Sequence, residues 1–372
     1  MTIGRATPRR AARGQTALPA EATALASAAR PATPVLLAVV VLVAMFALLA
    51  GAGPARGQSK VGTTVGGFLR IEPGARAAAL GNAGAALPGT IEAVYYNAGA
   101  IGLLERPAVQ YSHSFWFADI SFDYAAFALP VSGNSTLFAS VTALNSGEMD
   151  VRTVEQPLGT GERYTVANTA LAVGYGVRIT SRFAAGLQVN YATERIWHSS
   201  LHMFTMNMGT MYRLSESGIL LAFSLANVGP RAGFDGDDLA IRYDADPDRF
   251  GDNSSLPAEL WTDDFPLPGV FRLGLSVPFR PTREISMLFL AEALHPNDNS
   301  ESVNVGLEWA WRDLLALRAG YQTLFQTDRE LGLTLGFGIQ GYLGNNRYHV
   351  DYAWADHDHL QDTHRVSVVL VF

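Results

Sequence analysis

The sequence predicts an all-β fold: a transmembrane antiparallel β-barrel of about 14 strands with a Gly/Ala-rich N-terminal plug segment. Three observations lead to this prediction. Large apolar residues alternate with small or polar ones in many segments, charged residues are scarce, and the connections between these segments are short and long in turn. Together these features are typical of a barrel whose outer face meets lipid and whose inner face lines a lumen.

The alternation is clearest in residues 331–340, where every odd position is a large apolar residue and every even position is Gly, Thr or Gln. In a β-strand this period places the two sets on opposite faces. We therefore expect Leu335→Arg to cost about 2–4 kcal/mol if the site lies at the bilayer midplane. Thr334→Arg, on the lumen face, is expected to cost much less.

The composition agrees with a lipid-facing surface. Charged residues make up 16% and apolar residues 48% of the chain, whereas an ordinary soluble protein has about 25% charged residues. After residue 57 no apolar run approaches the roughly 18 residues of a spanning helix, so membrane spans there must be strands. The absence of cysteine excludes disulfides and thiolate catalysis.

Residues 1–57 are predicted to be a signal peptide with a long N-region. Five arginines precede the apolar run 35–52, and Ala55-Arg56-Gly57 supplies the small residues of a cleavage site before Gln58. An uncleaved membrane anchor is the alternative. Without these residues the formal charge changes from −7 to −12, and an acidic exported chain is a poor candidate for binding nucleic acid.

Residues 58–107 are predicted to be the plug segment, and residues 108–372 the barrel. The plug segment is rich in Gly and Ala, lacks sustained alternation, and has one short helix expected within 76–87. The expected strands cover 108–115, 119–130, 134–144, 165–177, 182–197, 200–213, 218–227, 270–279, 284–294, 301–311, 314–323, 331–340, 347–355 and 364–372. Every second connection, six in all, is short, as periplasmic turns are. The longest of the other connections, 145–164 and 228–269, fall on the external side.

Polar residues are predicted to gather on the lumen faces of these strands. The candidates are Arg178, Gln188, Asn190, Glu194, Arg272, Glu308, Arg318 and Asp351. Tyr and Trp residues toward the strand ends are expected at the level of the lipid headgroups.

Two acidic segments have residue types found in ion sites. Asp356-His357-Asp358-His359 has ligand types that suit a transition metal, and Asp244-Ala-Asp246-Pro-Asp248 resembles the start of a calcium loop. The second lacks the glycine and the bidentate acid of such loops, and solvated loops are favoured for both. We expect no metal and no cofactor. Since no nucleophile or phosphate-binding motif is present, the protein is not expected to be an enzyme.

The N-terminal part of the mature chain resembles the PorV/PorQ family, within the wider group of FadL-like outer-membrane barrels. Residues 67–87 (GFLRIEPGARAAALGNAGAAL) and 93–100 (AVYYNAGA) carry this resemblance, and 113–124 and the C-terminal hairpin extend it. Its sharpest elements are the plug-motif residues Gly74, Ala75, Arg76, Asn97 and Gly99. The chain departs from the family's Asn-Pro-Ala-Gly by lacking the proline.

The resemblance implies a role in type IX protein secretion or surface attachment of secreted cargo, with other secretion-system components and outer-membrane lipid as partners. The alternative is a FadL-like channel for uptake of hydrophobic small molecules through an apolar pocket between plug and wall. Phe234, Phe250, Trp261 and Phe265 in the loop 228–269 are candidates for a partner-binding surface or for a cap over the barrel mouth.

Overall fold

The computed structural model describes residues 1, 61–118, 120–246, 248, 255–326 and 329–372. The expected signal peptide, 1–57, therefore lies outside the described residues apart from Met1. All elements below belong to one compact unit, Arg56–Phe372. Among the described residues, no helix is both long enough and apolar enough to cross a membrane.

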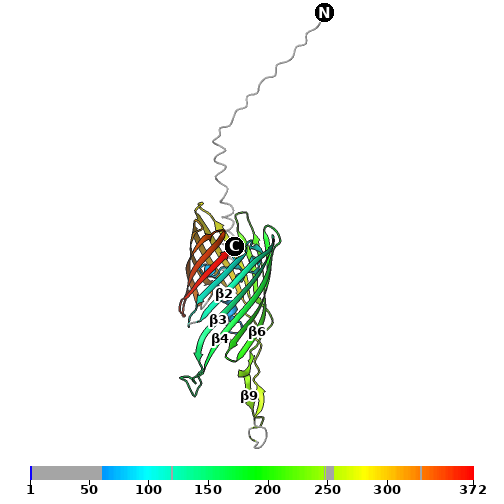
Figure 1. Ribbon diagram of the computed structural model, residues 1–372, viewed down its shortest axis with the longest axis vertical. Helices are drawn as coiled ribbons and strands as arrows, with labels where there is room; N and C mark the ends of the chain where they lie inside the picture. The colour runs from blue at the N-terminus through cyan, green and yellow to red at the C-terminus, as the bar shows by residue number, and fades with distance from the viewer. Residues whose placement is uncertain (2–60, 119, 247, 249–254, 327–328) are drawn as a thin grey trace. The chain divides into compact units, whose positions relative to one another are not determined.

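Fourteen antiparallel strands form a closed barrel, which confirms the predicted fold class. They are β1 (Ala108–Phe115), β2 (Ser121–Ser132), β3 (Ser135–Asp150), β4 (Arg163–Arg178), β5 (Phe183–Ile196), β6 (Ser199–Arg213), β7 (Leu220–Val228), β11 (Val270–Phe279), β12 (Ile285–Pro296), β13 (Ser302–Trp311), β14 (Leu315–Leu324), β15 (Leu331–Leu343), β16 (Asn346–His357) and β17 (Thr363–Val371). Each strand pairs with its neighbours in the chain, and β1 pairs with β17 to close the ring. Figure 1 shows the strands strongly tilted around the barrel.

The connections differ sharply between the two ends of the barrel. At one end, which we call the short-turn end, β2–β3 and β15–β16 are joined by two residues each, and no connection exceeds six residues. The C-terminus lies at this end (Figure 1). The opposite, long-loop end carries the connections 151–162 and 229–269. This difference is the one expected from the sequence.

Both long loops contain more strand than expected. β3 continues to Asp150, β4 begins at Arg163, and Glu148 pairs with Thr165. Beyond the barrel both faces of a hairpin meet water, so the apolar alternation ends while the backbone ladder continues.

The connection after β7 contains β8 (Asp235–Gly236), the 3-10 helix η3 (Asp237–Leu239), β9 (Ala240–Tyr243) and β10 (Leu256–Glu259). β8 pairs with the start of β6, and β9 and β10 pair with each other in a hairpin beyond the barrel (Figure 1).

The strand β15 shows the expected two faces. Leu335 is 43% exposed on the outside, whereas Thr334 is fully buried. The hydroxyl of Thr334 accepts a hydrogen bond from the backbone N–H of Gly81 at 3.0 Å. The expectation that Thr334→Arg is mild is therefore wrong, because the lumen at this point is filled by the plug.

Residues 61–107 lie inside the barrel and form short helices, namely η1 (Gly67–Arg70), α3 (Ala75–Ala78), α4 (Ala93–Tyr96) and η2 (Ala98–Leu103). The helix expected within 76–87 is limited to α3. Gly81 ends that segment with a φ of +67°, and a Cβ there would lie 2.5 Å from the carbonyl oxygen of Val305. Similarly, Gly186 on β5 admits the backbone of Ala98, so small residues on both sides allow plug and wall to meet closely.

Candidate functional site

The inner half of the lumen, toward the short-turn end, contains a chain of ion pairs between the plug and the wall. Arg76 of α3 binds Glu308 of β13 through two parallel hydrogen bonds of 2.8 Å each. Glu308 also accepts a 2.6 Å bond from Nε of Arg318 on β14, and Arg318 binds Asp351 of β16 at 2.7 Å. Glu308, Arg318 and Asp351, all on barrel strands, thus hold Arg76 of the plug in place.

A cavity of about 200 Å³ adjoins this chain at the short-turn end. Its lining includes Arg76, Glu308 and Arg318, and it adds the cationic residues Arg280 and Arg347. Since Glu308, Asp313 and Asp351 also line it, this inner cavity is of mixed charge, in contrast to the apolar outer surface of the barrel.

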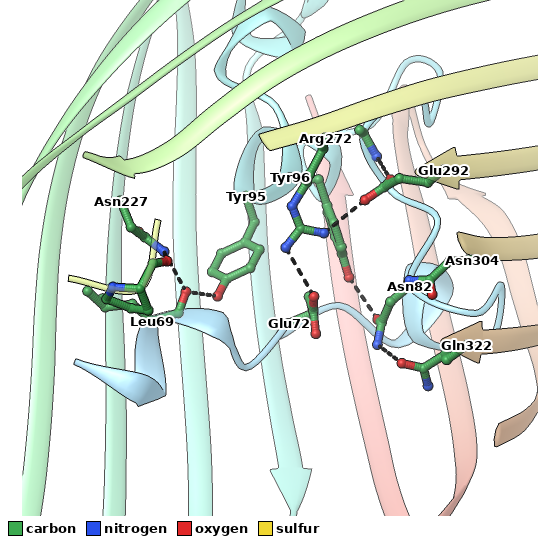
Figure 2. Close-up of polar contacts among 12 residues, drawn as sticks. Leu69, Glu72, Asn82, Tyr95, Tyr96, Asn227, Arg272, Glu292, Asn304 and Gln322 are labelled. Atoms are coloured by element: carbon green, nitrogen blue, oxygen red, sulfur yellow. Dashed lines mark hydrogen bonds and ion pairs between the residues drawn. The ribbon is translucent and has the colours of Figure 1, made fainter. Parts of the chain in front are cut away.

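Figure 2 shows a second ion-pair group, and the register of β12 with β13 places its residue Glu292 nearer the long-loop end than Glu308. Arg272 of β11 binds Glu292 of β12 at 2.9 Å and Glu72 of the plug at 3.2 Å. Its guanidinium carbon is 5.4 Å from the centre of the Tyr96 ring. The second carboxylate oxygen of Glu292 accepts a hydrogen bond from the backbone N–H of Ala85 at 2.7 Å. A buried charge cluster is stable only when its members are fully paired, and these contacts achieve that.

Uncharged side chains extend the contact between plug and wall (Figure 2). Tyr96 donates to Asn82 at 3.0 Å, and Asn82 donates to Gln322 of β14 at 2.8 Å. Within the plug, the hydroxyl of Tyr95 donates to the carbonyl oxygen of Leu69 at 2.7 Å, and the amide of Asn227 on β7 donates to the same oxygen at 3.5 Å. The plug is consequently bonded to β14 and to β7 by uncharged groups.

The plug-motif residues have structural roles in this arrangement. The backbone N–H of Ala75 donates to the hydroxyl of Ser367 on β17 at 2.8 Å, and a Cβ at Gly74 would overlap the carboxyl group of Glu92. Asn97 accepts a 2.8 Å bond from the N–H of Gly99.

The amide nitrogen of Asn97 donates at 3.1 Å to the carbonyls of Ala85 and Thr210. Asn97 thus joins two parts of the plug to β6, although the proline of the related motif is missing.

Two further polar pairs occupy the wall. Gln188 donates to Asn190 at 2.6 Å, and Asn190 donates to Thr205 at 2.8 Å. Glu194 is half-buried and interacts with the backbone of Gly66. Arg178 lies instead at the short-turn rim, where it binds Glu105 at 2.5 Å.

Sequence reasoning missed several charged residues inside the barrel, among them Glu72, Glu92, Glu292 and Arg365. Glu292 and Arg365 occupy inward positions of predicted strands, so the alternation itself would have identified them. Glu72 and Glu92 lie in the plug, where no periodicity indicates direction.

The expected apolar pocket between plug and wall is small and of mixed polarity. Its volume is about 40 Å³, and Leu69, Tyr95 and Tyr124 line it together with Gln188 and Arg272. Such a space holds one or two water molecules rather than an organic ligand.

An open groove of about 740 Å³ lies at the long-loop end. We call it the external groove. Tyr164, Ile196, Trp197, Phe234 and Val151 give it an apolar lining, and Asp150, Arg152, Ser199 and Asp238 edge it. It lies where the extended β3–β4 hairpin, the β5–β6 connection and the β8 segment meet.

Asp238 fixes one wall of the external groove. Its carboxylate accepts hydrogen bonds from the backbone N–H of His198 at 3.1 Å and from the hydroxyl of Ser199 at 3.2 Å, and it contacts Nδ1 of His198 at 3.0 Å. Desolvation raises the pKa of Asp238, but the bonds from His198 and Ser199 outweigh it and lower the pKa overall.

The candidate loop residues do not share one environment. Phe234 lines the external groove, Trp261 is 91% exposed, and Phe265 belongs to a bridge with Ala232. Phe250 lies outside the described residues. The structure thus assigns Phe234 to the groove and leaves Trp261 in solvent.

The His/Asp segment before β17 does not form a metal centre in the part of the chain that the structure describes, where no group of three or more potential ligands is arranged around one point. His357 is buried near the ring of Trp116, and His359 pairs with Glu330 at 3.1 Å.

Comparison with solved structures shows outer-membrane barrels of similar architecture. The toluene transporter TodX of Pseudomonas putida is 11% identical, with 79% of this chain and 96% of that chain aligned at a TM-score of 0.50. The monoaromatic hydrocarbon channel CymD is 8% identical, with 81% and 97% aligned at a TM-score of 0.51. At such low identity these similarities establish the fold alone.

No known sequence family matches the chain, and no curated protein matches it. The resemblance to PorV/PorQ proteins therefore stays a prediction from the sequence, whereas the barrel fold is shared with TodX and CymD.

Proposed function

We propose that the protein is an outer-membrane channel for uptake of hydrophobic small molecules. The observation that carries the proposal is the external groove, an apolar and aromatic recess open to the outside at the mouth of a plugged barrel. Binding sites for small molecules are typically such concave, largely apolar surfaces with a few polar groups at the edge. The barrel's likeness to TodX and CymD, a toluene transporter and a monoaromatic hydrocarbon channel, supports this proposal.

The proposed route begins in the external groove and leads past the plug. Since the space between plug and wall is about 40 Å³, a ligand of the size of toluene requires a movement of the plug. Such a movement has to separate plug residues such as Leu80 and Ile101 from the apolar cluster that they share with the wall, and it has to break the ion pair between Arg76 and Glu308.

The proposed location follows from the outer surface and from the N-terminal sequence. Outward side chains such as Leu333, Leu335, Phe337 and Ile339 are exposed and apolar, as in barrels that face lipid. We also propose that residues 1–57 direct export of the protein and are then removed. N-terminal sequencing of the protein from purified outer membranes tests cleavage before Gln58.

Uptake of radiolabelled toluene by vesicles containing the reconstituted protein tests the function. We expect Trp197→Ser and Phe234→Ser each to reduce the initial rate by about fivefold, because each removes an aromatic contact from the groove. Trp261→Ser is the matched control, since Trp261 is exposed and does not line the groove. Uptake no faster than in protein-free vesicles would overturn the proposal.

The secretion hypothesis has no support from these comparisons and rests on the sequence resemblance alone. Its partners, secreted cargo and other secretion components, would have to bind the long-loop end. Loss of cargo export upon deletion of the gene, with toluene uptake unchanged, would favour it over the channel.

A further inference from the structure

Arg365 is a buried guanidinium without a hydrogen-bond partner at two of its nitrogens. It lies on the lumen face of β17 and is 4% exposed. Neither Nε nor Nη1 has a hydrogen-bond partner among the described residues. The guanidinium carbon lies 5.2 Å from the centre of the Trp116 ring. Buried charged donors are almost always satisfied in folded proteins, so these two nitrogens indicate a missing partner.

The other arginines deep in the lumen have carboxylate partners. Arg76, Arg272 and Arg318 each bind at least one carboxylate at 2.9 Å or less. The two plug carboxylates that act electrostatically on Arg365 are bonded elsewhere. Glu72 accepts a bond from Arg272 at 3.2 Å, and Glu92 accepts one from the N–H of Ala77 at 2.7 Å.

Two hydroxyl groups beside Arg365 are also buried and unpartnered in the described structure. Ser114 is the residue that faces Arg365 across the β1–β17 pair, and Thr363 precedes it by two positions on the same face of β17. A hydroxyl and a guanidinium both donate hydrogen bonds, and an anion accepts from both. The guanidinium can only donate, and the two hydroxyls can donate or accept; none of the three has a partner at these atoms in the described structure, and an anion would accept from all three.

The external side of this group is aromatic. The ring of Trp116 lies 5.6 Å from that of Phe117 and 6.0 Å from that of His357. An inorganic anion has no apolar surface to place against these rings, whereas a planar organic acid does.

We propose that Arg365, Ser114 and Thr363 form a binding site for the carboxylate of a small aromatic acid whose ring packs against Trp116. The proposal rests on the channel function above and specifies its ligand as anionic. The planar fork of arginine matches a carboxylate in two parallel hydrogen bonds.

Equilibrium binding to the purified full-length protein in detergent tests the site, with benzoate and toluene as probes. The two molecules share a ring and differ by the carboxylate. We expect saturable benzoate binding that weakens about tenfold or more in Arg365→Gln and recovers partly in Arg365→Lys. Toluene binding is expected to be unchanged in both. Arg178→Gln is the matched control, because Arg178 lies at the short-turn rim.

Ser114→Ala and Thr363→Val provide a second test if Arg365→Gln does not fold, and each is expected to weaken benzoate binding about two- to tenfold. Equal benzoate affinity in the native protein and in all folded variants would overturn the proposal. Displacement of benzoate by an equal concentration of chloride would overturn its assignment to an organic acid. Vesicle uptake of toluene without binding of benzoate would refute this site and leave the channel function intact.

Discussion

At the scale of the residue, the lumen is organised by charged side chains that hold the plug. Glu308 receives bonds from the plug through Arg76 and from the wall through Arg318. Removing one member of a buried ion pair leaves its partners buried and without a counter-charge. The resulting loss of stability is larger than the net stabilisation that the intact pair provides. Single substitutions here are therefore expected to affect the plug before they affect the strands.

We expect Glu308→Gln to destabilise the folded protein by about 3–5 kcal/mol, because two buried guanidinium groups lose their shared carboxylate. A urea titration of the protein refolded into vesicles measures this change. Glu284→Gln is the control, since Glu284 pairs with Arg312 in an exposed turn at 2.6 Å. That variant should change stability by less than about 1 kcal/mol. Equal losses in the two variants would contradict a role for Glu308 in holding the plug.

Neighbouring residues of β15 give a second residue-scale prediction. Leu335→Arg is expected to cost about 2–4 kcal/mol if Leu335 faces the bilayer midplane. Thr334→Arg should cost at least as much, because the new side chain occupies the volume of the plug at Gly81. Thr334→Ser keeps the hydroxyl and serves as the control. Limited proteolysis distinguishes the two arginine variants, since Thr334→Arg alone should make residues 61–107 susceptible to cleavage.

At the scale of the element, the connection after β7 combines a groove wall with a separate hairpin. β8 pairs with β6 and supports the external groove through η3, whereas β9 pairs with β10 and with no barrel strand. The backbone N–H of Leu260 bonds the carbonyl of Leu239 at 2.8 Å, which closes the base of the hairpin. The hairpin is thus an addition to the barrel rather than part of its wall.

Replacement of residues 240–259 by Gly-Gly should leave the barrel folded, because pairing of β7 with β11 does not involve them. Heat-modifiable migration in gel electrophoresis and the thermal midpoint are expected to match those of the native protein. Toluene uptake should also persist, since Phe234 and Asp238 remain. Failure of the shortened chain to form a barrel would show that the hairpin is required for folding.

At the scale of the whole molecule, the sequence predicted the wall far better than the interior. Successive side chains of a strand point to opposite faces. Because one face meets lipid and the other the polar interior, apolar and polar residues alternate in the sequence, as at Leu335 and Thr334. The plug has no such period. Its residues are directed by contacts with distant strands, such as Ala75 with Ser367, and composition does not indicate which strand a Gly or Ala will meet.

The same reasoning explains the outcome at the candidate sites. Arg272, Glu308, Arg318 and Asp351 were identified because they interrupt apolar strands. The external groove was not foreseen, because it is assembled from three connections whose chain positions are far apart. Trp197 and Phe234 come together only through the pairing of β8 with β6.

The β1–β17 pair joins the barrel seam to the plug. The hydroxyl of Ser367 on β17 accepts a bond from the backbone N–H of Ala75 in the plug. At the same seam the N–H of Phe372 bonds the carbonyl of Pro107, where plug and barrel join. A barrel opened between β1 and β17 would lose the plug's contact with β17 together with the strand pairing, so we expect barrel closure and plug seating to depend on each other.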